Sequence, residues 1–182
     1  MSTSTAEGTS SSGCFIDTGV FFAAFNRNDE MHGDGAAALV SSMLGWFGRV
    51  YTSTYVIDEA VTLTKAKMGG PDAVRLADDI MGSKRIARLD VDEATVRDAL
   101  ATFRDRSDVR GLSFTDCTTL ALVERMKVGT LLSFDGGFKP FVPALLGEGY
   151  HGSLSKERRD VLAKVAQRLG IRLEEPTAAG RP

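Results

Sequence analysis

The sequence contains few of the residues that form disulfide bonds in small secreted proteins or that bind zinc. Its 182 residues include two cysteines, Cys14 and Cys117, and two histidines. Two cysteines this far apart do not make a disulfide framework or a cysteine-rich zinc site. Both lie in apolar surroundings, which favours small core residues in a reducing compartment. The cysteine content therefore excludes a disulfide-stabilised secreted protein.

Long apolar runs and a strong positive charge are also missing. No apolar run reaches the ~20 residues of a membrane-spanning helix. The N-terminus lacks the basic and apolar regions of a signal peptide, so we expect a cytoplasmic protein with no membrane segment. Lys and Arg number 22 against 24 for Asp and Glu, a net charge of -2. Without an overall basic field, binding of nucleic acid must depend on a local groove, on metal ions or on a partner.

The chain does contain a regular alternation of short apolar runs with segments of helical periodicity. Strands are predicted at 14–16, 50–53, 85–89 and 130–134. Helices are predicted at 18–26, 32–47, 55–68, 71–81, 114–127 and 153–169. One more helix is predicted to run from Asp90 or Asp92 to 103. Strands that alternate with helices predict parallel βαβ units. We therefore expect the α/β class: a three-layer α/β/α sandwich around a central, mostly parallel sheet.

This pattern divides the chain into one domain with two tails. Residues 1–13, rich in Ser and Thr, have the composition of a disordered tail. The α/β domain is predicted to span 14–150, and a C-terminal helical extension packed on the same domain to span 151–174. That extension has an amphipathic pattern. Residues 175–182 are predicted to be a second tail.

Four acids occupy equivalent places in the predicted topology. Asp17 ends the first strand, Glu59 lies in the first turns of the helix after the second strand, Asp116 lies in the first turn of the helix after Ser113, and Asp135 ends the strand that follows. The carboxyl ends of parallel strands meet at one edge of a sheet, where ligands bind. We therefore expect all four carboxylates at the same edge.

Carboxylates gathered in this way repel one another and raise each other's pKa, unless a cation neutralises them. Oxygen ligands without a His or Cys cluster favour Mg²⁺ or Mn²⁺ over zinc. Such a centre activates water and stabilises charge at a phosphorus atom. The four acids therefore predict a metal centre that promotes in-line displacement at phosphorus.

Each acid also has a structural explanation. Asp116 would be stabilised by the helix macrodipole, and Asp17 and Asp135 would serve as turn residues at strand ends. Asp58 is an alternative to Glu59 because it lies closer to the start of its helix. We favour Glu59, since it falls one helical turn after that start, on the face turned toward the sheet.

The segments around the acids are Phe15-Ile16-Asp17-Thr18, Thr52-Ser53-Thr54-Tyr55-Val56-Ile57-Asp58-Glu59, Leu112-Ser113-Phe114-Thr115-Asp116-Cys117 and Phe134-Asp135-Gly136-Gly137-Phe138. In this order and at this spacing they resemble the four acidic motifs of the PIN-domain family, and in particular its VapC-type toxin ribonucleases. The resemblance covers about residues 14–140.

The resemblance implies a parallel five-stranded sheet and an Mg²⁺- or Mn²⁺-dependent endoribonuclease that cleaves RNA. It also implies a homodimer and, in toxin members, a small inhibitory antitoxin. The implied catalytic and metal-binding acids are Asp17, Glu59, Asp116 and Asp135, and the implied hydrogen-bond donors beside them are Thr18, Ser53 and Thr115. The chain departs from the family after Asp135, where no short terminal strand is recognisable, and in residues 150–182, which exceed a minimal PIN domain.

Other functions remain open at this point. The chain could instead belong to PIN-domain nucleases of RNA processing or decay that have no antitoxin, or be a non-catalytic PIN-like protein that binds a partner. A phosphatase- or receiver-like protein with a phosphorylated Asp17 is disfavoured. The phosphatase pattern requires a second Asp two residues after the nucleophile, and here Gly19 occupies that position.

Overall fold

The computed structural model describes residues 13–171 and 173, so both predicted tails lie outside it except for Gly13. Its elements are β1 (Cys14–Ile16), α1 (Thr18–Phe25), α2 (His32–Met43), β2 (Val50–Ser53), α3 (Thr54–Met68), α4 (Gly70–Gly82), β3 (Ile86–Leu89), α5 (Glu93–Asp105), α6 (Phe114–Arg125), β4 (Thr130–Leu132), the 3₁₀ helix η1 (Gly136–Phe138), β5 (Leu145–Leu146), α7 (Tyr150–Ser153) and α8 (Lys156–Arg168). Within these described residues, no helix combines the length and apolar character needed to cross a membrane.

The core of the molecule is a five-stranded sheet in the order β3-β2-β1-β4-β5. Every neighbouring pair is parallel; in the central strand, Cys14 is opposite Val50 of β2 and Thr130 of β4. β1 is completely buried because its three residues, Cys-Phe-Ile, face helices on both sides. The sequence-based prediction of an α/β sandwich with a parallel sheet is confirmed.

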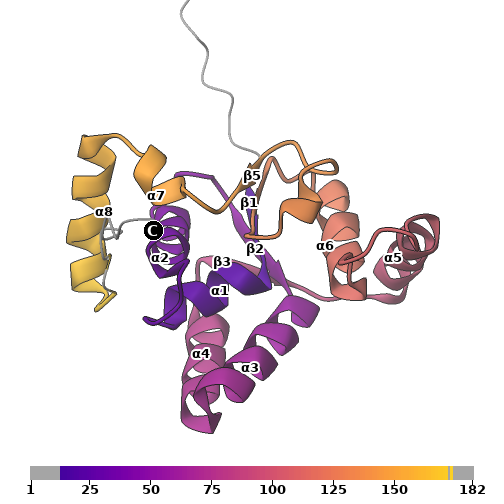
Figure 1. Cartoon of the computed structure of the whole chain (residues 1–182), viewed down its shortest axis with the longest axis horizontal. Helices are drawn as coiled ribbons and strands as arrows, with labels where there is room; N and C mark the ends of the chain where they lie inside the picture. The colour runs from indigo at the N-terminus through magenta and orange to yellow at the C-terminus, as the bar shows by residue number, and fades with distance from the viewer. Residues whose placement is uncertain (1–12, 172, 174–182) are drawn as a thin grey trace, which may run out of the picture.

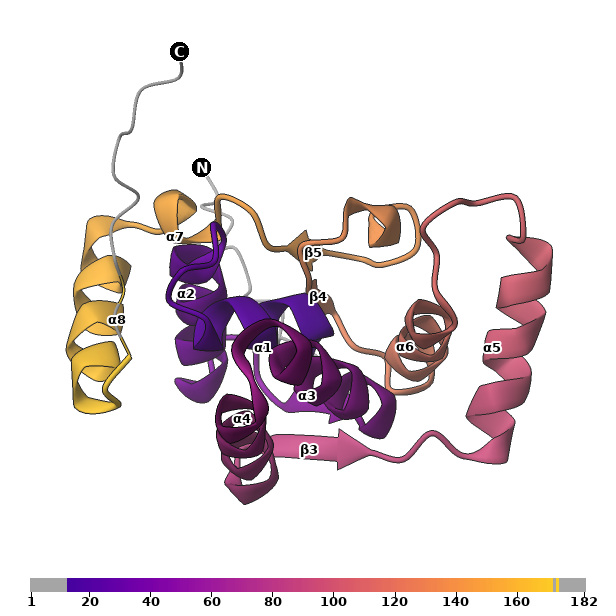
Figure 2. The ribbon, with the colours of Figure 1, turned by 60° about the horizontal axis from the view of Figure 1, so that its bottom comes forward.

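Helices cover both faces of this sheet (Figures 1 and 2). The chain moves from β1 through β2 to β3 and then returns past β1 to β4. With right-handed crossovers, α1 to α4 therefore lie on one face, where α1 packs on α2 and α3 packs on α4. Helices α5 and α6 pack on each other on the opposite face. The carboxyl ends of β1, β2 and β4 all open at the same edge.

Several predicted boundaries were wrong. The second helix ends at Met43 rather than at residue 47, because Gly45 takes a left-handed backbone with φ +79°. The fourth strand ends at Leu132, short of residue 134. The last predicted helix, 153–169, starts later, since α8 begins at Lys156, and the separate short helix α7 ends at Ser153. Asp92, one of two predicted caps, accepts a hydrogen bond of 2.8 Å from the Thr95 amide at the start of α5.

The segment after Asp135 does contain the fifth strand, which was not recognisable in the sequence. β5 has two residues, Leu145 and Leu146, which pair with Leu131 and Leu132. A strand of two residues is too short to show a periodic sequence pattern, so only its pairing with β4 identifies it as a strand. Gly147 follows it, and a Cβ atom there would overlap the carbonyl oxygen of Ser133. β5 therefore lies close against the end of β4.

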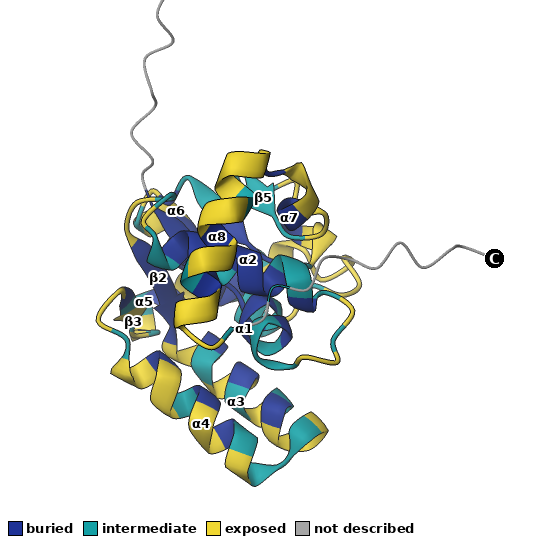
Figure 3. Ribbon diagram, turned by 90° about the vertical axis from the view of Figure 1, so that its left-hand side faces the viewer, coloured by how far each residue is buried: buried dark blue, intermediate teal, exposed yellow. Residues whose placement is uncertain are grey.

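The C-terminal helices α7 and α8 pack on α2, and Figure 3 shows α8 in front of α2 with its exposed residues outward. The Asp34 carboxylate on α2 accepts hydrogen bonds from the backbone amides of Gly149 at 2.7 Å and His151 at 2.8 Å. The Tyr150 hydroxyl donates to the Ser41 hydroxyl at 2.9 Å. Asp34 thus satisfies the amides at the start of α7, which a short helix cannot pair internally.

Replacement of Asp34 by alanine tests this attachment. Two hydrogen bonds to a carboxylate are lost and two amides are left unpaired, so we expect Asp34→Ala to lower the free energy of unfolding by about 2–4 kcal/mol. Urea denaturation measures it. The control is Asp72→Ala, which removes a carboxylate paired at 3.3 Å with the exposed Arg75; a change below about 1 kcal/mol is expected there. Equal effects of the two substitutions would contradict the assignment.

Candidate active site

The candidate site lies at the carboxyl edge of the sheet, where β1 and β4 run side by side. Asp17 directly follows β1, and its backbone amide donates to the Leu132 carbonyl of β4 at 3.0 Å. The residue is therefore fixed as an extension of the sheet, and it is only 7% exposed. A carboxylate this buried loses most of its hydration, so its neighbours decide its charge.

Ser133 connects two of the predicted acids. Its hydroxyl donates to Asp17 Oδ2 at 2.7 Å and accepts from the Asp135 amide at 3.0 Å. Ser133 is 2% exposed and stands directly after β4, which is adjacent to β1 in the sheet. One buried hydroxyl thus orients the Asp17 carboxylate and fixes the backbone that carries Asp135.

Glu59 reaches the same place from α3. That helix starts directly after β2, where the Ser53 hydroxyl accepts a hydrogen bond from the Val56 amide at 3.1 Å. Glu59 lies in the second turn of the helix, and its Oε2 accepts from the Thr18 hydroxyl at 2.9 Å. Of the two alternatives left open by the sequence, it is Glu59 rather than its neighbour Asp58 that is bonded to the residue following Asp17.

Asp116 and Asp135 each cap a turn as well as facing the site. Asp116 Oδ2 accepts from the Ser113 amide at 2.6 Å, and the Ser113 hydroxyl accepts from the Asp116 amide at 3.0 Å, which makes a capping box at the start of α6. Asp135 lies three residues beyond the end of β4, and its Oδ1 accepts from the Gly137 amide at 2.7 Å. Asp135 is thus a turn residue, as its structural explanation states, and Asp116 has a structural role at the start of α6; neither role excludes a second one.

The four acids, called here the acidic cluster (Asp17, Glu59, Asp116 and Asp135), act on one another electrostatically. Burial raises the pKa of Asp17 from 3.8 to about 6, and the charges of Asp116 and Glu59 add to the rise, against hydrogen bonds from Ser133 and Thr18. Burial also raises the pKa of Asp116, and the charges of Asp135 and Glu59 contribute. The structure therefore brings all four predicted acids within electrostatic reach of one another.

The donor chemistry of the acidic cluster suits a hard divalent cation. Each carboxylate uses one oxygen in a hydrogen bond described above, and a carboxylate has two oxygens that can accept further partners. Repulsion within the cluster would be relieved by a cation bound between the acids. Within residues 13–171 and 173, however, no three acidic, His or Cys side chains converge tightly enough to define a metal site. The residues fit such an ion by type, and closer convergence would be needed to coordinate it.

The predicted hydrogen-bond donors have different surroundings. Thr18 contacts Glu59 as described, whereas Ser53 caps α3. Thr115, in the first turn of α6, accepts at its carbonyl from the Thr118 hydroxyl at 2.7 Å. Sequence reasoning missed Ser133. The available signal was a small polar residue that ends the apolar run of β4, two positions before Asp135.

Three comparisons with known proteins find relatives of this chain. The PIN domain family model matches residues 14–141. A VapC ribonuclease of Archaeoglobus fulgidus is 30% identical over 156 residues, which cover 86% of this chain and 96% of that protein. The 23S rRNA-specific endonuclease VapC20 of Mycobacterium tuberculosis is 27% identical over 124 residues, covering 68% of this chain and 90% of VapC20. The crystal structure of VapC20, described as a toxin that cleaves the sarcin-ricin loop, has a TM-score of 0.59 with 27% identity and covers 71% of this chain and 97% of that one.

Replacement of Asp17 by asparagine tests the electrostatics of the cluster. Because the pKa of Asp17 is about 6 in the folded protein and 3.8 ordinarily, the folded state holds this proton more tightly, and stability falls as pH rises from about 4 to 6. The amide of an asparagine side chain carries no such charge at either pH. In EDTA at pH 7 we expect Asp17→Asn to be more stable than the unsubstituted protein by about 1–3 kcal/mol, with little difference at pH 4.

Urea denaturation at the two pH values measures this difference. The control is Asp78→Asn, at an exposed position of α4, for which a change within about 0.5 kcal/mol is expected at both pH values. A stability of Asp17→Asn that is equal to or below that of the unsubstituted protein at pH 7 would refute the proposed destabilisation.

Proposed function

The chain belongs to the PIN-domain family, with VapC ribonucleases among its relatives, and from this premise we propose that it is a metal-dependent endoribonuclease. The resemblance in the four acidic motifs predicted this family. We further propose that the enzyme is the toxin component of a type II toxin–antitoxin pair, because its relatives carry the names of such ribonucleases. The identity with the Archaeoglobus protein extends over nearly the whole of that relative.

The observation that carries the proposal is that carboxylates from four separate segments lie at the carboxyl edge of one parallel sheet and influence one another electrostatically. Burial makes the Asp17 anion costly, and two other acids add to that cost. A carboxylate that is retained at this edge despite the cost of its charge is a candidate for a functional role. Binding of a divalent cation is the use that fits an all-oxygen set of ligands.

In the proposed reaction, Asp17 and Asp116 anchor the cation, and Glu59 and Asp135 complete the set. Mg²⁺ or Mn²⁺ would supply an activated water and stabilise charge at the scissile phosphate. Ser133 favours the ionised form of Asp17 by donating to Oδ2 and restricts the rotation of that carboxylate. Thr18 donates a hydrogen bond to Glu59, which is exposed to solvent.

The partners follow from the proposed activity. The substrate is RNA, and one relative is named as an endonuclease specific for 23S rRNA. We propose a homodimer in the cytoplasm that is inhibited by a small antitoxin. An RNA-processing nuclease without an antitoxin would have the same chemistry, and a small protein encoded by the adjacent reading frame that binds and inhibits the enzyme would separate the two.

Cleavage of RNA by the purified protein tests the activity. We expect cleavage of ribosomal RNA with Mg²⁺ or Mn²⁺, no cleavage in excess EDTA, and a loss of at least about 100-fold in Asp116→Asn, since a metal anchor is removed. Asp78→Asn serves as the control with full activity, and circular dichroism verifies that each variant is folded. Full activity in EDTA would falsify the metal-dependent mechanism.

Replacement of Ser133 by alanine tests its positioning role. We expect cleavage to fall by about 10- to 100-fold and the concentration of Mg²⁺ or Mn²⁺ needed for half-maximal rate to rise, because Asp17 loses its hydrogen-bond donor. Ser42→Ala is the matched control: Ser42 is also fully buried, and its hydroxyl donates to the Ala38 carbonyl at 2.8 Å within α2. An unchanged metal requirement in Ser133→Ala would exclude the role.

A further inference from the structure

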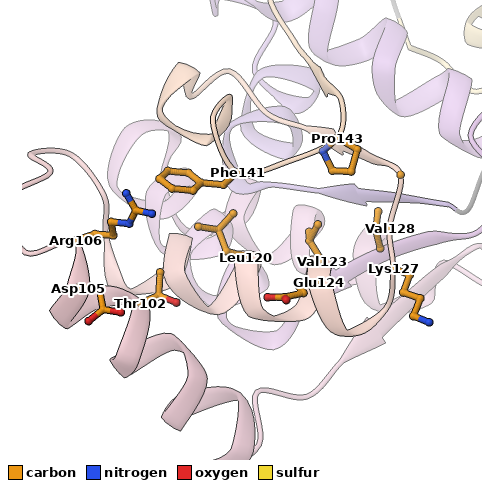
Figure 4. Close-up of a pocket in the computed structure, with 11 residues that line it drawn as sticks. Thr102, Asp105, Arg106, Leu120, Val123, Glu124, Lys127, Val128, Phe141 and Pro143 are labelled. Atoms are coloured by element: carbon orange, nitrogen blue, oxygen red, sulfur yellow. The ribbon is translucent and has the colours of Figure 1, made fainter.

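A groove outside the acidic cluster runs along α6 and is not used by the proposed reaction. It has a volume of about 760 Å³ and lies between α5, α6 and the segment that follows η1 (Figure 4). Leu120 and Val123 of α6 form its apolar floor, and Phe141 covers one side. Arg106 and Lys127 lie at its two ends, as the close-up shows. We call this the α6 groove.

The α6 groove lies along the helix whose first turn carries Asp116. Asp116, Leu120 and Val123 follow one another at steps of four and three residues, which places them on one face of α6. At 1.5 Å per residue, this face runs for about 10 Å from Asp116 to Val123. That is the length of about three stacked nucleotides at about 3.4 Å per step. A strand cleaved at the cluster would thus reach the groove within a few nucleotides.

At the Arg106 end, the walls of the groove are connected to the segments that carry Asp135 and Asp116. The Phe141 amide donates to the Phe138 carbonyl at 2.9 Å, and the Phe138 amide donates to the Asp135 carbonyl at 3.3 Å, so two successive turns join Phe141 to Asp135. At the end of α5, the Phe103 ring packs edge-on against Phe114 with centroids 5.9 Å apart, two residues before Asp116. This end of the groove is therefore connected to the segments that carry Asp135 and Asp116.

The chemistry of the groove suits nucleobases better than phosphates. The Arg106 guanidinium lies 4.9 Å from the centroid of the Phe141 ring, and bases stack on both kinds of flat surface. The rim carries two cations, Arg106 and Lys127, and two acids, Asp105 and Glu124. Equal numbers of opposite charges do not attract a phosphate chain, but carboxylates accept hydrogen bonds from the amino groups of bases.

We propose that the α6 groove binds the nucleotides next to the scissile phosphate, with one base stacked at the Arg106–Phe141 pair. The inference rests on the proposed ribonuclease function and adds a substrate subsite to it. It makes Phe141 a residue that determines which RNA sites are cleaved, although it touches none of the reacting atoms. A peptide segment of a protein partner is the competing occupant of an apolar floor of this kind.

The test compares an RNA oligonucleotide that the enzyme cleaves with copies that carry a single abasic nucleotide at each position flanking the cleavage site. For the unsubstituted protein, we expect kcat/KM to fall roughly 5- to 100-fold at one flanking position, the effect of losing one base–aromatic stack. Phe141→Leu keeps an apolar side chain without a ring. It should cleave the intact RNA slower by a similar factor, lose the sensitivity to that abasic position and keep the same metal requirement.

Phe25→Leu is the matched control, since Phe25 also carries an arginine over its ring, with Arg75 5.3 Å from the centroid, on the face of the sheet away from the groove. It should retain the abasic profile of the unsubstituted protein. An unchanged abasic profile in Phe141→Leu would overturn the inference and leave the ribonuclease function intact. If Phe141→Leu cleaves RNA normally but is no longer inhibited by a bound protein, the groove is the site of a protein partner. That result would also overturn the inference. No RNA cleavage by the unsubstituted protein would overturn the function itself.

Discussion

The burial of Asp17 beside other carboxylates is the constraint on which the rest of the site depends. A carboxylate at the end of a central strand loses its hydration, and its neighbours make the loss worse. The fold compensates in part with the hydroxyl of Ser133 and the amide of Thr18. Both donors are fixed by backbone, one after β4 and one at the start of α1. The geometry of the site is therefore set by the sheet and needs no flexible loop.

The same constraint explains why each of the four carboxylates also accepts a hydrogen bond from a neighbouring residue. Asp116 closes a capping box with Ser113, and Asp135 caps the turn of η1. A carboxylate without such a hydrogen bond would rotate toward water. The hydrogen bonds of Asp116 and Asp135 restrict that rotation. Turn formation and cation binding are compatible uses of these two residues, since each employs a different oxygen.

Much of this arrangement was predictable because its signals are local. The buried strands β1 and β2 and the helices behind them follow from apolar runs and periodicity, and Asp17 and Asp116 follow from their positions at a strand end and a helix start. Ser133 was not predictable in the same way, since its partner Asp17 lies 116 positions away and only the β1–β4 pairing brings the two together. The two-residue strand β5 and the short helix α7 depend equally on distant partners, namely β4 and Asp34.

The position of β5 also determines where the folding unit ends. The match to the family model stops at residue 141, before Leu145 and Leu146. Yet the Leu146 carbonyl accepts from the Ser133 amide at 3.0 Å, and the Ala144 carbonyl accepts from the Leu131 amide at 2.8 Å. A protein shortened to the matched segment would expose β4 as an unpaired sheet edge, open to pairing with other chains. We therefore expect the smallest autonomous unit of this chain to extend beyond the matched segment and to include β5.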